Sequence, residues 1–231
     1  MVLRLLLPLL FGVAGTAVLV WLGVWQMQRL AWKETVLSEI DARISAAPSA
    51  LPTVVDPNDD RYLPVRVSGS TGKEDILVQS SLKRIGAGFR VIAPFTLADG
   101  RTILLDRGFL RASEKATPRP PVSMAVEGNL HWPDELDRFT PDPDIAGRLW
   151  FARDIPSLAA ALEADPVLVV ARATSVDQTP IFPHPVDSSG IPNDHLQYAV
   201  TWFGLAAVWV VMTAAFLRSR LREPPANLKE S

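Results

Sequence analysis

The chain has 231 residues, a formal net charge of -2 and no cysteine. Its length accommodates one medium-sized domain, because single cores usually take about 100–200 residues. Without cysteine, disulfides, thiolate metal ligands and cysteine nucleophiles are excluded. A nucleic-acid partner is also excluded, because phosphate binding needs clustered Lys and Arg and the sequence contains no such cluster.

Two uncharged, mostly apolar segments predict two transmembrane helices. The first covers residues 5–28, which exceeds the roughly 20 residues that a helix needs to cross a bilayer. A cleaved signal peptide is the competing interpretation, but this stretch is long and lacks a small-residue cleavage site at its end. The second span covers residues 195–217 and is followed directly by three arginines, Arg218, Arg220 and Arg222.

Basic residues at the two ends of the chain indicate the orientation. Arg4 precedes the first span and the three arginines follow the second, and positive charge favours the cytoplasmic side. We therefore expect a cytoplasmic N-terminus (residues 1–4), a periplasmic domain (residues 29–194) and a cytoplasmic basic tail (residues 218–231). Since no Arg/Ser-rich transit peptide precedes the first span, we expect a bacterial plasma (inner) membrane, with a trimmed mitochondrial form as the alternative.

The segment between the spans predicts a mainly antiparallel β domain with one short helix. Apolar residues recur every four positions over residues 30–46, which predicts an amphipathic continuation of the first helix. Alternating apolar and polar residues predict strands at 63–67, 76–80, 89–95, 102–105, 122–130 and 167–173. Ala98-Asp99-Gly100 predicts a hairpin turn, and residues 155–162 predict the short helix. The proline-rich residues 174–193 predict a connector back to the membrane. The predicted fold is therefore a membrane α+β protein in which two transmembrane helices flank a β-rich domain.

Motifs that would indicate an enzyme are missing. Gly86-Ala87-Gly88 is not followed by a helical pattern, so a dinucleotide-binding loop is not expected. The chain has no Gly-x-Ser-x-Gly elbow of a serine hydrolase. His131 and His184 are isolated in the sequence, and we expect both to be ordinary surface residues. An enzymatic function is therefore not expected.

Three segments carry short motifs that occur together in one known family. The first lies at the exit of the first span: Leu22-Gly23-Val24-Trp25-Gln26 with Arg29, Trp32 and Lys33. The second lies in the central strands: Gly88-Phe89, Pro94-Phe95, Asp99-Gly100 and Arg107-Gly108. The third leads into the second span: Asn193-Asp194-His195-Leu196-Gln197-Tyr198-Ala199-Val200-Thr201-Trp202. Together they resemble the surfeit locus protein 1 family, named Shy in yeast, whose members support cytochrome c oxidase biogenesis.

The resemblance implies an assembly factor for a haem–copper cytochrome c oxidase. In bacterial relatives the histidine of the third segment, here His195, binds haem a. The expected function is to bind haem a and to assist its insertion into, or its stabilisation in, oxidase subunit I. The expected partners are subunit I, haem a synthase and membrane lipid. The alternative is a haem-free membrane scaffold that holds subunit I or other assembly factors.

A helix start just before the second span places His195 at the outer edge of the bilayer. Asn193 is the expected N-cap, so His195 falls in the first turn, where its imidazole can bind haem iron. Helical spacing puts Trp202 on the same face as His195. Arg29 and Lys33 are expected at a similar depth, where cations can pair with haem propionates.

The expected site therefore consists of His195 as the iron ligand, with Arg29, Lys33 and Trp202 as further haem-binding residues. Simpler explanations remain open for the same residues. An interfacial histidine can be merely solvated, and juxtamembrane bases can reach phospholipid.

Overall fold

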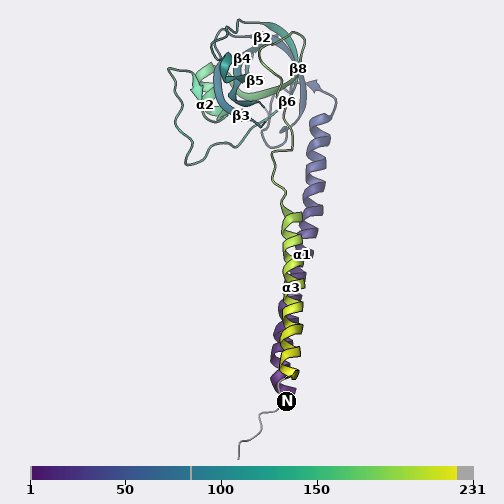
Figure 1. Ribbon diagram of the computed structural model, residues 1–231. Helices are drawn as coiled ribbons and strands as arrows, with labels where there is room; N and C mark the ends of the chain where they lie inside the picture. The colour runs from purple at the N-terminus through teal and green to yellow at the C-terminus, as the bar shows by residue number, and fades with distance from the viewer. Residues whose placement is uncertain (1, 84, 223–231) are drawn as a thin grey trace, which may run out of the picture. The chain divides into compact units, whose positions relative to one another are not determined.

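The computed structural model describes residues 2–83 and 85–222, which form two compact units (Figure 1). The helical unit combines Met1–Ser38 with Ser189–Ser231, and the barrel unit is Glu39–Ser188. Met1, the first residue of the expected cytoplasmic N-terminus, and residues 223–231, most of the expected basic tail, lie outside the described residues.

The helical unit pairs most of α1 (Val2–Ser45) with α3 (His195–Arg222) (Figure 1). Both helices are long and apolar enough to cross a membrane, as the sequence predicts. They run antiparallel, because Gly12 lies against Thr213 near one end and Gly23 lies against Phe203 nearer the other. A Cβ atom at either glycine would come within 3 Å of its neighbour, so glycine permits this close approach.

One face of α3 packs against α1. Ala199 and Ala206 are buried on this face, and Trp209 donates a hydrogen bond from Nε1 to the Gly12 carbonyl oxygen at 3.0 Å. The Trp209 ring also lies 5.4 Å from the ring of Phe11. Most other large apolar side chains of both helices are exposed in the protein alone, as expected for surfaces that face lipid.

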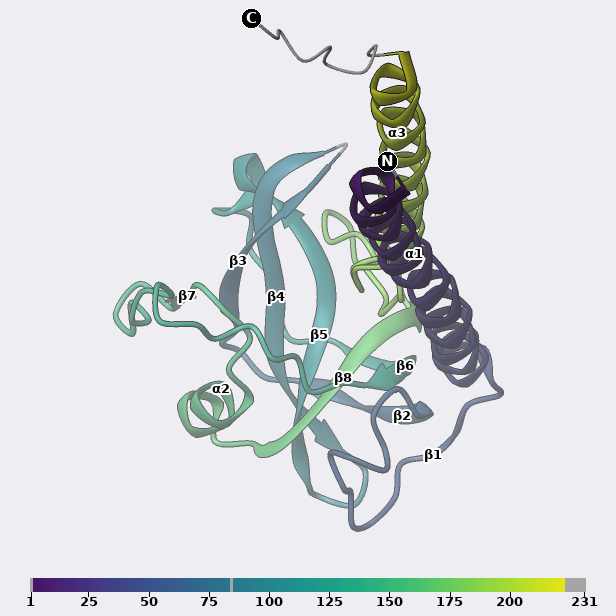
Figure 2. The same cartoon turned by 90° about the horizontal axis from the view of Figure 1, so that it is seen from below.

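The barrel unit is built on strands that pair in a closed ring (Figure 2). Within the described residues the ring contains β2 (Pro64–Thr71), β6 (Ser123–Leu130), β8 (Asp165–Thr174), β5 (Thr102–Arg111) and β4 (Gly86–Leu97). Pairing of Gly69 with Leu97 helps to join β2 to β4 and closes the barrel. At this crossing a Cβ on Gly69 would lie 2.2 Å from the Thr96 carbonyl oxygen, so the two backbones meet only because residue 69 is glycine.

Shorter elements complete the unit. Strands β3 (Ile76–Leu82) and β7 (Leu149–Trp150) extend the sheet beyond β4, and β1 (Ser49–Ala50) pairs with β2. A 3-10 helix, Ala112–Glu114, follows β5, and α2 (Ile155–Leu162) precedes β8. The six strands expected from the sequence are all present, most of them longer than expected, and α2 has the expected bounds.

The strand pairing is mixed. The hairpins β3–β4 and β4–β5 are antiparallel, and the second turns at Gly100, whose positive φ of 87° suits glycine. However, β5 and β8 pair in parallel, as do β1 with β2 and β3 with β7. The β-rich fold between two apolar helices is confirmed, while these parallel pairings were not predicted.

Alternating side chains divide the barrel unit into two apolar cores. Along β8, Val169 points into the barrel core, whereas Leu168 and Val170 belong to the core that lies under α2. Along β5, Leu105 and Leu104 divide in the same way. Successive strand residues face opposite sides of a sheet, so a run of apolar residues in one strand supplies both cores.

The first half of the expected connector packs on the barrel. Phe182 and Phe109 exchange two backbone hydrogen bonds of 2.8 Å, and Ile181 is buried. Gly108 has a φ of +126°, and a Cβ there would lie 2.1 Å from the Phe182 carbonyl oxygen. The motif Arg107-Gly108 therefore makes room for this segment, and Arg107 binds it through the side chain of Gln178.

The end of α1 is attached to the barrel within the same unit. The Ile44 carbonyl oxygen accepts hydrogen bonds from Asn129 Nδ2 at 3.0 Å and from Arg172 Nη1 at 3.3 Å. Asn129 is fully buried and also donates to the Tyr62 carbonyl oxygen. These bonds satisfy one of the carbonyl groups that every helix leaves unpaired at its C-terminus.

Candidate functional site

The imidazole of His195 meets a buried side chain of α1. His195 is the first residue of α3, and its Nδ1 lies 2.8 Å from Oε1 of Gln26. Gln26 is only 9% exposed although it lies in the apolar part of α1. The expected cap at Asn193 is wrong: α3 begins at His195, directly after Asp194, and Asn193 Oδ1 is buried without a hydrogen-bond partner in the described structure.

This hydrogen bond favours one tautomer of a neutral His195 ring. An amide oxygen can only accept a hydrogen bond, so in a neutral imidazole Nδ1 carries the hydrogen and donates a hydrogen bond to Gln26 Oε1. The lone pair then lies on Nε2, which is the form that binds a metal ion. Partners of this kind orient ligand histidines in metalloproteins and fix their tautomer. The pair is thus suited to holding one axial ligand for a haem iron.

The other expected site residues lie on the same two helices. Trp202 is half-buried, two turns from His195 along α3. Arg29 is exposed, and its guanidinium carbon lies 3.9 Å from the centre of the Trp32 ring. Lys33 is half-buried. At 1.5 Å rise per residue, Arg29 and Lys33 lie about 4.5 Å and about 10 Å beyond Gln26 along the helix axis.

The structure therefore brings His195 together with Gln26, a residue that the sequence interpretation did not place in the site. The available signal was a polar amide inside an uncharged span, next to Trp25 in the Trp-Gln motif. A buried amide in a membrane helix needs a hydrogen-bond partner, but the sequence does not show which residue provides it. Arg29 instead stacks on Trp32, an interaction that holds its charge near the end of the apolar segment.

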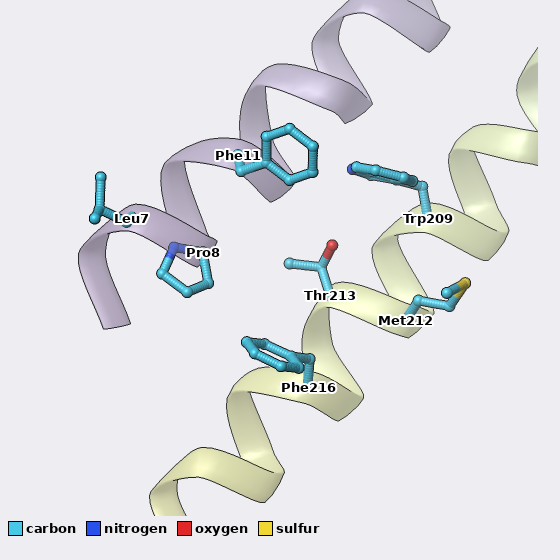
Figure 3. Close-up of a pocket in the computed structure, with 7 residues that line it drawn as sticks. All are labelled: Leu7, Pro8, Phe11, Trp209, Met212, Thr213 and Phe216. Atoms are coloured by element: carbon cyan, nitrogen blue, oxygen red, sulfur yellow. The ribbon is translucent and has the colours of Figure 1, made fainter. Parts of the chain in front are cut away.

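The opposite end of the helix pair has an apolar groove of about 510 Å³ (Figure 3). It is lined by Leu7, Pro8 and Phe11 of α1 and by Trp209, Met212, Thr213 and Phe216 of α3. Figure 3 shows the rings of Phe11, Trp209 and Phe216 around this space. None of the lining side chains is titratable and Thr213 carries the one hydroxyl group among them, so the groove suits hydrocarbon.

A second cavity, of about 140 Å³, lies in the barrel unit. Its lining includes His131 and His184, which were expected to be unrelated surface residues; that expectation is wrong, because the fold brings both to one cavity. Burial, together with the nearby charge of Arg153, lowers the pKa of His131 to about 4. Burial likewise lowers the pKa of His184, with a further contribution from Arg90. Both imidazoles are therefore neutral at neutral pH.

No cluster of three or more His, Asp or Glu residues that could hold a metal ion occurs in the described part of the chain. A metal held through a group that brings most of its own ligands, as a porphyrin does, needs only one or two protein ligands. The lone His195 is compatible with that kind of ligation.

Comparison with known proteins agrees with the motifs. The model of the SURF1 family matches residues 13–207. Surfeit locus protein 1 of Xenopus tropicalis is 32% identical, over 80% of this chain and 68% of its own length. The human surfeit locus protein 1 is 29% identical over 80% of this chain and 69% of its own. A SURF1-like protein of Rickettsia felis is 26% identical over 87% of this chain and 93% of its own length.

Proposed function

Because this chain belongs to the SURF1 family, we propose that it binds haem a and assists the insertion of haem a into, or its stabilisation in, subunit I of a haem–copper oxidase. Family membership implies a role in cytochrome c oxidase assembly, and the assembly factors of this family are not enzymes. The haem is a cargo in this proposal, so the chain needs a site that holds the group without reacting with it.

The hydrogen bond between Gln26 and His195 carries the proposal. It leaves Nε2 of His195 as the free ligand nitrogen, on a ring whose orientation the buried amide maintains. In this proposal His195 binds the iron, Trp202 contacts the porphyrin, and Arg29 and Lys33 pair with the propionates. Bound haem a would supply the redox-active iron of the oxidase.

The proposed topology follows the charges at the ends of the helices. Arg218, Arg220 and Arg222 would hold the end of α3 in the cytoplasm, with both termini inside and the barrel unit in the periplasm of a bacterium. In this proposal subunit I and haem a synthase meet the site within the bilayer. The test is a pair of reporters fused after residue 222, one active only in the cytoplasm and one active only in the periplasm. We expect activity from the cytoplasmic reporter alone. Activity of the periplasmic reporter would contradict this orientation.

A haem-free scaffold is the second candidate, and one observation favours it. A glutamine–histidine hydrogen bond between two apolar helices also serves as ordinary polar adhesion, typically about 0.6 kcal/mol and up to about 2 kcal/mol. In that case the pair would maintain the helix contact, and the chain would hold subunit I through its helices and barrel alone.

The test is the haem content of the protein produced together with haem a synthase. We expect His195→Ala to remove most of the haem a absorbance of the purified protein. Gln26→Leu should lower it as well, because the tautomer and orientation of His195 are no longer maintained. Gln197→Ala, an exposed amide in the same turn of α3, is the matched control and should retain wild-type haem. Equal haem in the wild type and His195→Ala would favour the scaffold.

A further inference from the structure

The barrel cavity is lined by two arginines, Arg90 and Arg153, whose hydrogen-bonding capacity is only partly used within the described residues. Arg90 donates hydrogen bonds from Nε to Asp106 Oδ2 at 2.5 Å and from Nη2 to the His184 carbonyl oxygen at 2.8 Å. Arg153 donates hydrogen bonds from Nε and Nη2 to the carboxylate of Glu135. Within the described residues, Nη1 of neither arginine makes a hydrogen bond, although Arg153 Nη1 lies 3.6 Å from Asp106 Oδ2. Both side chains line the cavity and are largely buried, at 8% and 12% exposed.

The two carboxylates that pair with these arginines, the buried Asp106 and the exposed Glu135, are not among the residues that line the cavity. Asp106 is fully buried, and its two oxygens accept from Arg90 and from the Gly108 backbone N–H. Glu135 accepts from the backbone and side chain of Arg153. The acceptors for these two arginines are therefore supplied by residues outside the cavity lining.

An imidazole adds a second, independent sign of a missing ligand. Nδ1 of His131 is buried and has no hydrogen-bond partner in the described structure. The ring is held by stacking on Tyr62, with ring centres 5.6 Å apart. A buried polar atom without a partner costs about 1–3 kcal/mol, so proteins seldom keep one unless water or a ligand satisfies it.

We propose that this cavity binds a carboxylate group, which accepts hydrogen bonds from Arg90, Arg153 and His131. Two guanidinium groups and an N–H match the several lone pairs of a carboxylate, and the fork of Arg favours oxyanions. The volume of about 140 Å³ is well below the roughly 300–1,000 Å³ of pockets for drug-sized ligands, so only one small group fits.

The rim selects the charge of the ligand. Asp187 lines the cavity and is exposed, so its negative charge opposes a dianion more strongly than a monoanion. Asp106 and Glu135 already balance the charges of the two arginines, which also disfavours a second negative charge. A carboxylate is therefore preferred over phosphate. Its source is either a free small acid or the C-terminus of a peptide.

The three histidines of the chain provide a direct assay. Full-length protein in lipid nanodiscs, labelled in its histidine rings, is titrated with sodium acetate against sodium chloride at constant ionic strength and pH 7. We expect the ring signals of His131 and His184 to shift and saturate at millimolar acetate, whereas His195 in the helical unit stays still. His131→Gln and His184→Ala assign the signals.

Variants and competing ligands complete the test. Arg153→Lys keeps the charge but loses the fork, so acetate should bind at least ten-fold more weakly, while Arg66→Gln on the barrel surface should not alter binding. A tripeptide is compared as competitor of acetate in two forms, with a free C-terminus and with an amidated C-terminus. Competition by the free form alone identifies a chain terminus as a source of the carboxylate. Competition by neither form identifies a free acid. The proposal would be overturned if the histidine ring signals shift linearly with acetate concentration, as they would with chloride. Tighter binding of phosphate than of acetate would overturn it as well.

Discussion

Asp106 is the acceptor on which two buried arginines of the barrel depend, and replacing it with asparagine tests that role. Asn has the same shape and can still accept the Gly108 N–H, but Asp106→Asn removes the charge and places an NH2 donor where Oδ2 accepts from Arg90. It leaves Arg90 and Arg153, 8% and 12% exposed, with only the exposed Glu135, which pairs with Arg153, as a remaining counter-ion. Breaking one partner out of a buried ion pair costs about 3–5 kcal/mol, because the other charge is left desolvated.

The assay is amide hydrogen exchange of β4 and β5 in the full chain, which measures the free energy of opening for each segment. A loss of about 3–5 kcal/mol should speed exchange of these amides by roughly 100-fold to 1,000-fold or more, since about 1.4 kcal/mol corresponds to a factor of ten. Asp99→Asn makes the same chemical change in the exposed pair with Arg101 and should leave exchange almost unaltered. If Asp106→Asn changes exchange by less than ten-fold, the buried pair does not stabilise the barrel as described.

Three further predictions concern other parts of the structure. His131 has a pKa of about 4 when folded and near 6.5 when unfolded, so only the unfolded chain gains a proton as the pH falls between these values. Titration of this residue should lower the free energy of unfolding of the barrel by about 3 kcal/mol from pH 7 to pH 4. Denaturant unfolding over this pH range measures the loss. An equal pH dependence of the free energy of unfolding in the wild type and His131→Gln would contradict this prediction. Gly108→Ala should release the segment around Phe182 and speed its amide exchange, because the added Cβ would lie 2.1 Å from the Phe182 carbonyl oxygen. If the Phe182 amide stays protected from exchange, the backbone adjusts to the new side chain and this prediction is wrong. Gly12→Val should weaken helix packing by about 1–3 kcal/mol in thermal unfolding, whereas Gly204→Ala, with open space around its Cβ, should be neutral; equal effects would refute the proposed close contact.

Local patterns were sufficient for most elements. The two apolar helices, the strands of the barrel, the hairpin at Gly100 and helix α2 all follow from periodicity and turn residues over a few positions. The run of apolar residues in β5 was more ambiguous, because both of its faces are buried and alternation is lost. The prediction for residues 102–105 therefore ended well before Arg111, where β5 ends.

Closure of the barrel was decided only by tertiary structure. The parallel pairing of β5 with β8 joins residues about 60 positions apart, and no turn sequence specifies such a pairing. The two-residue strands β1 and β7 are too short to carry any alternation. The docking of Phe182 on Phe109 likewise depends on the space above Gly108, which a Cβ atom would fill.

The sequence by itself determined the family motifs, the two membrane-compatible helices and the position of His195 at the start of the second one. Only the folded chain decided what these side chains meet: Gln26 for His195 on the helix pair, and a shared cavity for His131 and His184 in the barrel. The physical reason is that helix and strand formation depend on neighbours along the chain. Tautomers, pKa values and unused hydrogen-bond donors instead depend on groups that are distant in sequence and close in space.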